Sequence, residues 1–296
     1  MGFLLQTLDK VLPDPQPELV FEIGDRTVHG ARRDGSKVLA HVDRPLPPSA
    51  SLDPEPVADG LDALRNTIAD VVRDLGPVNT RHAAVLLPDN LGRLAVFEFE
   101  RVPRRPNDLR RAVEDRFRQS FASDSRAARV ACHLQPGSRP ASVLSATLPI
   151  AAVLHCEQAF KAAGLIPDYV GLSTVACLRL IEDPEMTVLL KISPDRMTMI
   201  AVESGIVRLV RQIALAPSFG ENAEEALREI LADLFPTLVY IGERLERPAA
   251  RLLVTGLDGL LPHALDTLPH EVGCPVTPLT DGAAPDAVGL RGYIRG

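Results

Sequence analysis

The sequence has little of what several kinds of protein require. It contains four cysteines among 296 residues, no tryptophan and only 4% aromatic residues. The cysteines lie far apart in apolar segments, which favours reduced core thiols over disulfides or a zinc site. Scarce aromatic side chains disfavour base stacking on single-stranded nucleic acid. A formal net charge of −7 also disfavours a dedicated nucleic-acid binder.

Long apolar runs and common catalytic motifs are missing as well. The chain has no run of about eighteen apolar residues, and its first residues lack the basic region and cleavage site of a signal peptide. We therefore expect a cytoplasmic location. No serine stands in a nucleophile-elbow context, and no Gly-x-x-x-x-Gly-Lys motif occurs. The seven histidines form no i,i+4 pair on an expected helix, so we expect neither a metal site nor ordinary enzyme chemistry.

What is present is a strand, turn and strand pattern that occurs twice. The first copy covers residues 19–32 and the second residues 188–205, and a Gly-containing turn follows a third strand at 251–261. Taken singly, each glycine is best explained as the end of an ordinary β-hairpin. In this order, the three elements resemble actin-like ATPases, in which two lobes offer hairpin turns to a nucleotide. The resemblance implies an α/β, actin-like (ribonuclease H-like) two-lobed fold.

The same resemblance assigns a nucleotide site, because backbone N–H groups of Gly turns approach phosphates and acidic residues hold Mg²⁺ in such proteins. The candidate cofactor-binding residues are Glu22, Gly24, Asp25, Thr27, Gly256 and Gly259. The pattern is degenerate at four positions, namely Lys191, Ser193, Pro194 and Leu257. Proline has no N–H to offer a phosphate, and the Leu257 side chain is expected to point at the adenosine. We therefore expect no ATP or weak Mg-ATP binding, and no hydrolysis.

The rest of the chain predicts a small domain inserted into the first lobe. An amphipathic helix is expected at 61–75, and helices at 107–121 and 151–163 alternate with strands at 93–100, 128–134 and 141–148. The block 93–163 therefore reads as an inserted α+β subdomain. The expected division is an N-terminal segment at 1–17, a first lobe at 18–92, the insertion at 93–163, a return of the first lobe at 164–184 and a second lobe at 185–296.

Four short motifs are similar to one family of actin-like proteins. They are residues 85–93, the segment 157–167 that ends Ala-Gly-Leu-Ile-Pro, the Gly205-x-x-Arg208-x-x-Arg211 stretch and residues 287–292. Together they resemble the type IV pilus assembly protein PilM, a relative of the cell-division protein FtsA and of the cytoplasmic part of the type II secretion protein GspL. The resemblance covers most of residues 18–293.

The resemblance implies a scaffold at the inner membrane. PilM proteins bind the cytoplasmic tail of the inner-membrane protein PilN near the inserted subdomain and connect it to the pilus assembly ATPase. A partner of this kind would bring this chain to the membrane surface. Strand alternation places Val96 on one face of the strand and the Phe97/Phe99 pair on the other. One face is expected to pack in the subdomain core and the other to contact the partner. Arg104 and Arg105 are expected at the rim of the partner groove. The expected partner contacts are therefore Val96, Phe97, Phe99, Arg104 and Arg105.

The sequence leaves two other functions open. The chain could be an actin-fold ATPase or filament former of the FtsA type, which a nucleotide-binding measurement would separate from an adaptor. It could also be a small-molecule kinase of the same superfamily, which the missing acidic residue of the second hairpin disfavours. The arginines of the helix at 107–121 favour a solvated face with internal ion pairs over a patch for anionic lipid.

Overall fold

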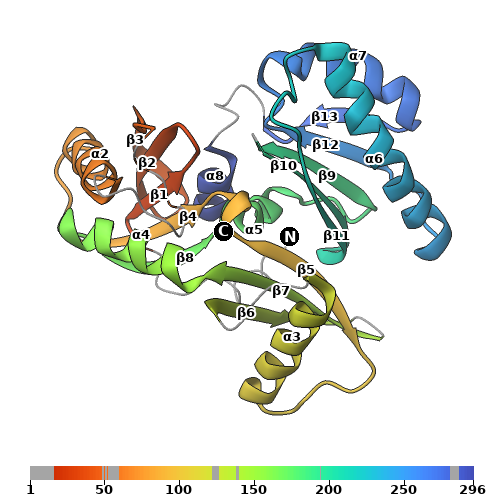
Figure 1. The fold of residues 1–296 in the computed structure, drawn as a ribbon, viewed down its shortest axis with the longest axis horizontal. Coiled ribbons are helices and arrows are strands. Elements are labelled where there is room, and N and C mark those ends of the chain that lie inside the picture. The colour runs from red at the N-terminus through yellow and green to blue at the C-terminus, as the bar shows by residue number, and fades with distance from the viewer. Residues whose placement is uncertain are drawn as a thin grey trace. The chain divides into compact units, whose positions relative to one another are not determined.

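A computed structural model describes residues 17–48, 50, 52, 60–121, 127–137, 140–193, 195–280 and 287–296. These residues form two compact units (Figure 1). The larger unit contains residues 17–180 and 287–296, and the smaller unit contains residues 181–280. The predicted N-terminal segment lies outside the described residues except for Pro17.

The larger unit contains the first of two five-stranded sheets, with strand order β3-β2-β1-β4-β8. Its strands and helices are β1 (Leu19–Ile23), β2 (Thr27–Asp34), β3 (Lys37–Pro45), α2 (Gly60–Asp74), β4 (His82–Leu87), η1 (Asp89–Leu91), β8 (Ile166–Leu172), α4 (Ile150–Ala162), α5 (Ser173–Cys177), η3 (Leu178–Leu180) and α8 (Val288–Arg295). β1, β2 and β3 are antiparallel, whereas β4 is parallel to both β1 and β8. The residues of β1 are buried throughout, as expected of a central strand covered on both faces.

One sheet face is covered by α2 and α4. The helix predicted at 61–75 is confirmed as α2, and its apolar residues Leu64, Ile68 and Val71 are fully buried. Close packing here requires a glycine in β2. A Cβ on Gly30 would lie 2.2 Å from Cγ1 of Val71, so a larger residue would push the helix off the sheet.

A three-stranded antiparallel sheet follows, with strand order β5-β7-β6. It contains β5 (Arg93–Phe99), β6 (Ala128–Leu134) and β7 (Ala141–Pro149), and α3 (Pro106–Phe121) covers one of its faces. The predicted insertion also included the helix now seen as α4. That helix instead packs mainly on α2 and β8, so it belongs with the large sheet. The difference arises because the sequence shows that α4 has apolar residues to bury, but it does not show which of the two sheets buries them.

The second five-stranded sheet, with order β11-β10-β9-β12-β13, organises the smaller unit. The elements are β9 (Thr187–Ser193), β10 (Arg196–Glu203), β11 (Ile206–Ala214), α6 (Ala223–Arg244), β12 (Arg251–Thr255), η4 (Asp258–Leu260), α7 (Leu261–Val272) and β13 (Val276–Pro278). Its core joins Val188 and Leu190 of β9 to Ile230 and Leu234 of α6. The Asn222 side chain caps α6 by accepting hydrogen bonds from the N–H groups of Glu224 and Glu225.

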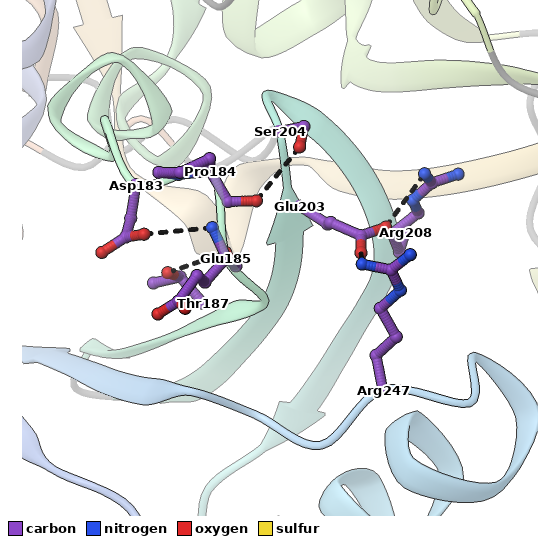
Figure 2. Close-up of polar contacts among 8 residues, drawn as sticks. All are labelled: Asp183, Pro184, Glu185, Thr187, Glu203, Ser204, Arg208 and Arg247. Atoms are coloured by element: carbon purple, nitrogen blue, oxygen red, sulfur yellow. Dashed lines mark hydrogen bonds and ion pairs between the residues drawn. The ribbon is translucent and has the colours of Figure 1, made fainter.

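The Gly205-x-x-Arg208-x-x-Arg211 motif has a structural role in this unit. Ser204 and Gly205 have positive φ angles of 50° and 76°, as a tight hairpin between β10 and β11 requires. Figure 2 shows Glu203 between Arg208 and Arg247. A guanidinium nitrogen of each arginine lies 3.0 Å from a carboxylate oxygen of Glu203. Arg211 donates hydrogen bonds to Asp233 and Thr237, which fastens β11 to α6.

The C-terminal residues correct the predicted division of the chain. The second lobe was expected to run to residue 296, but α8 packs on α5 and β1 in the larger unit. Two glycines allow this close contact. A Cβ on Gly292 would lie 2.1 Å from the Ala176 carbonyl oxygen, and one on Gly289 would lie 2.5 Å from Ser173 Oγ. The C-terminal segment therefore completes the unit that contains β1.

We expect the larger unit to lose stability in mild acid through His155 of α4. This side chain is buried, and burial lowers its pKa from the ordinary value of 6.5. Below that ordinary value the unfolded chain takes up a proton that the folded chain resists, so stability falls as the pH falls. Urea unfolding of the wild type and His155→Gln at pH 7.5 and pH 5.5 measures this. The variant should lose less stability between the two pH values; equal losses would contradict the assignment.

Candidate functional site

Glu22 lies next to the last residue of β1, beside the predicted nucleotide turn, but its carboxylate is bound inside the protein. The side chain is 3% exposed. One carboxylate oxygen accepts a hydrogen bond from Ser173 Oγ, and the other accepts one from the backbone N–H of Leu290 at 2.7 Å. Leu290 lies in the first turn of α8, where unpaired N–H groups and the helix dipole favour a negative charge. Glu22 therefore anchors the C-terminal helix.

The turn after Glu22 is also closed by its own backbone. The N–H of Gly24 donates to the carbonyl of Thr27 at 2.8 Å, and the carbonyl of Arg26 accepts from Leu46 at 2.7 Å. Asp25 is exposed at the tip of this turn. A cavity of about 200 Å³ adjoins it, and the residues that line it are Ile23, Gly24, Asp25, Leu46, Pro47, Pro48, Ala50, Leu52, Pro88, Asn90 and Leu91.

The second hairpin places a cation where an actin-type site uses a carboxylate. Lys191 is 8% exposed, in β9, and pairs in register with Thr198 of β10 and Thr255 of β12. Ser193 ends the strand. Pro194 lies outside the described residues, so its effect on the turn stays a prediction.

The third turn differs from expectation at Leu257. This side chain is 3% exposed and lies in the apolar core of the smaller unit, so the prediction that it points toward an adenosine is wrong. The error came from treating the turn as open, whereas its apolar residue packs inward. Gly256 has a φ of 75°, and a Cβ there would lie 1.9 Å from the carbonyl oxygen of Ile192. Gly259 is exposed in η4, and a Cβ there would meet no atom within 4 Å.

These residues fit a magnesium and phosphate group poorly. Glu22 is committed to Ser173 and Leu290, and the Gly24 N–H is committed to Thr27. Within the described part of the chain, the cavity beside the first turn is lined by one acidic side chain and by no lysine or arginine. A phosphate would need cations or unpaired N–H donors at this place. Gly256 is explained by the close approach of its backbone to the carbonyl of Ile192.

A larger cavity lies beside the face of the three-stranded sheet that α3 does not cover. Its volume is about 320 Å³. The residues around it come from β5, β6, β7, α4, β8 and α5: Leu94, Arg129, Val130, Ala131, Cys132, His133, Leu144, Ser145, Ala146, Thr147, Leu148, Val153, Tyr169, Val170, Gly171, Leu172 and Val175. Exposed Arg129 and Ala131 show that the cavity opens along β6. The interior is mostly apolar and includes buried Leu94, Leu144 and Leu172.

Strand register explains why this cavity exists. Leu94 of β5 pairs with Ala146 of β7, which pairs with Ala131 of β6, so these three side chains share one sheet face. The opposite face carries Phe99 and is filled by α3. Ala131 and Ala146, in the middle of the face that lines the cavity, leave space that larger side chains would fill. The result is a shallow apolar floor.

Two edge strands flank this floor. β6 is an edge of the three-stranded sheet, and β8 is an edge of the five-stranded sheet. An edge strand presents backbone N–H and C=O groups to which an extended peptide can add. Tyr169 of β8 also lines the cavity and packs against Tyr293 of α8, with ring centroids 5.4 Å apart. Burial raises the pKa of its phenol. The cavity therefore has the features needed to hold an extended, largely apolar peptide.

The five predicted partner contacts are not among the residues that line this cavity. Val96 shares the cavity face of β5 with Leu94 and is partly exposed. The structure does not bring Phe97 and Phe99 to the cavity. Phe97 contacts Phe117 edge to face at 5.0 Å, and Phe99 is buried in the cluster beneath α3. Strand alternation indicated the two faces, but it could not tell which one a helix would cover.

Arg104 and Arg105 lie just before α3 and are exposed. The carbonyl of Arg105 accepts the first hydrogen bonds of the helix, from the N–H groups of Asp108 and Leu109. Sequence reasoning missed the residues that form the cavity floor, Ala131 and Ala146. The signal that could have found them is the pairing of two small residues on adjacent strands of the inserted sheet.

Comparison with known proteins supports the fold. No protein-family model and no curated protein matches the chain. The structure is similar to a "PilM-PilN type IV pilus biogenesis complex" with a TM-score of 0.73 and 21% identity, covering 95% of this chain and 99% of the other. A Bacteroides thetaiotaomicron protein with an actin-like ATPase fold has a TM-score of 0.57 at 10% identity, with 98% of each chain covered.

A third similar structure is the ethanolamine utilization protein EutJ from Carboxydothermus hydrogenoformans. Its TM-score is 0.51 at 12% identity, with 99% of this chain and 97% of the other covered. Among the residues that the structure describes, no helix is both long and apolar enough to cross a membrane. The predicted fold class is confirmed: the chain has the actin-like fold.

Proposed function

We propose that this chain is a PilM-like adaptor of a type IV pilus or type II secretion platform. In this proposal it stays in the cytoplasm and captures the cytoplasmic tail of a PilN-like inner-membrane protein. The fold likeness to the PilM–PilN complex extends over nearly the whole of both chains and supports this function. The observation that carries the proposal is the apolar cavity between β6 and β8, whose strand edges suit an extended peptide.

Nucleotide is not part of the proposed mechanism. Glu22 holds α8 rather than a metal ion, and Lys191 replaces the second acidic residue. We therefore propose that the chain acts without hydrolysing ATP, and that a pilus assembly ATPase, where it binds, is a separate partner. Peptide capture depends on cavity shape and backbone edges, so it needs no intact phosphate site.

Membrane recruitment tests this function. We expect a reporter fusion of the full chain to enter the membrane fraction when it is co-expressed with the PilN-like inner-membrane protein of the same genome. A PilN-like protein without its cytoplasmic tail should leave the fusion in the soluble fraction, because it lacks the captured peptide. Fractionation followed by reporter quantification makes the comparison.

Two outcomes would count against the adaptor. Equal membrane association with intact and tail-deleted partner would mean that the tail is not captured. Absence from the membrane with both would mean that no such partner recruits the chain. Repeating the assay with purified components, with and without Mg-ATP, separates the ATPase alternative, since an adaptor of the proposed kind binds equally in both conditions.

A further inference from the structure

Three metal-ligating side chains meet on the hairpin formed by β2 and β3, away from the peptide cavity. Nδ1 of His29 lies 2.7 Å from Oδ1 of Asp43, and Nε2 of His41 lies 3.2 Å from the same oxygen. One ligand atom from each residue lies within 4.8 Å of the other two. Two imidazoles and one carboxylate are a ligand set that suits zinc and neighbouring divalent metals.

The strand register brings these residues together. His29 of β2 is paired directly with Asp43 of β3, and His41 is paired with Ala31, two residues along. Side chains of paired residues and of residues i and i+2 point to the same sheet face, so all three project together. The two imidazole rings are stacked with their centroids 6.4 Å apart and an angle of 8° between their planes. A two-stranded scaffold of this kind positions its ligands more rigidly than a loop does.

Burial gives the cluster one closed side and one open side. His29 is 2% exposed, whereas the side chains of His41 and Asp43 are 37% and 44% exposed. Nε2 of His29 is buried on the side of the β1–β2 turn, 3.9 Å from where a Cβ on Gly24 would lie. Nδ1 is therefore the nitrogen that His29 turns toward the other two residues. The exposed side leaves room for a water ligand.

We propose that His29, His41 and Asp43 form a Zn²⁺ site with one water as the fourth ligand. Nδ1 of His29, Nε2 of His41 and a carboxylate oxygen of Asp43 hold the metal. A neutral imidazole that binds zinc through Nδ1 carries its ring proton on Nε2. Because the site joins β3 to β2, bound metal should stiffen this edge of the five-stranded sheet. The site is independent of the proposed partner.

The chain contains a matched control for this site. His82 and Asp168 form an exposed pair with Nδ1 of His82 2.8 Å from Oδ2 of Asp168. The distance between nitrogen and oxygen in this pair is close to the 2.7 Å between Nδ1 of His29 and Oδ1 of Asp43. His82 and Asp168 are not in the group of three potential ligands found among the described residues. A histidine and a carboxylate alone give a weak site, so this pair should contribute nothing measurable.

Zinc titration of the full chain without a histidine tag tests the proposal. Competition with a chromophoric chelator should show one bound Zn²⁺ per chain for the wild type and for His82→Ala. His41→Ala and Asp43→Asn should each lower the affinity at least about tenfold, the lower end of the loss seen even for outer-shell partners. Cobalt substitution should give the visible absorption of a four-coordinate site in the wild type, lost in His41→Ala.

Both altered side chains are substantially exposed, so the variants should keep the fold, which circular dichroism checks. Asp43→Asn also keeps an acceptor oxygen for His29, so it separates loss of a metal ligand from loss of a structural hydrogen bond. Zinc binding that is equally tight in the wild type and His41→Ala would place the metal elsewhere, for example on a cysteine, and would overturn the proposal. Absence of stoichiometric zinc binding by the wild type would do the same.

Discussion

Replacing Glu22 with alanine is expected to release α8 and to destabilise the larger unit by about 2–4 kcal/mol. The substitution leaves two buried donors without their acceptor, the hydroxyl of Ser173 and the N–H of Leu290. It also removes the negative charge at the first turn of α8, where the helix dipole favours one. Glu22→Gln keeps one acceptor oxygen but no charge, so its loss should be smaller.

Two measurements separate local release of α8 from global unfolding. Urea unfolding gives the change in midpoint for the unit. Maleimide labelling under native conditions reports on Cys177 of α5, which is fully buried and lies beneath Gly292 of α8. Mass spectrometry should find Cys177 labelled faster in Glu22→Ala than in the wild type. Asp34→Ala, which removes an exposed carboxylate of the same sheet, serves as the control.

An unchanged urea midpoint together with a protected Cys177 in Glu22→Ala would contradict this role. Glu22 would then be available for another ligand, and the nucleotide site would regain its strongest candidate. The same experiment therefore decides whether the residue that most resembles an actin-type metal ligand serves structure or chemistry.

Local sequence patterns predicted much of this fold. The spacing of Leu64, Ile68 and Val71 predicts α2 because an amphipathic helix must bury one face. The hairpins at β1–β2 and β9–β10 follow from apolar strands with polar turns between them. In each case the information lies within a few residues of the chain, where periodicity and turn chemistry act.

Contacts between distant residues were the part that sequence could not supply. Leu290 is 268 positions from the carboxylate that it binds, and no local pattern joins it to Glu22. Leu257 occupies a position that resembles a ligand turn, yet the core of its own unit buries it. His29 and His41 show no helical ligand spacing, because they meet across a hairpin whose register had to be known first.

Filling the floor of the peptide cavity should abolish partner capture. Ala131 of β6 is exposed and faces the cavity opposite Ala146. Ala131→Trp places an indole over this floor without entering the core beneath α3, so the fold should be kept while a peptide loses its site. We expect binding of the tail peptide to weaken by about 100-fold or more, which corresponds to about 2.7 kcal/mol.

Fluorescence polarisation with the labelled cytoplasmic tail of the PilN-like protein measures this loss. Ala131→Ser should bind like the wild type because it keeps the floor open. Leu39→Trp is the matched aromatic control, since it puts the same side chain on an exposed position of β3, another edge strand. Melting temperatures should agree among all four proteins. If Ala131→Trp binds the tail as tightly as Leu39→Trp does, the peptide lies elsewhere, and the cavity between β6 and β8 is not the capture site.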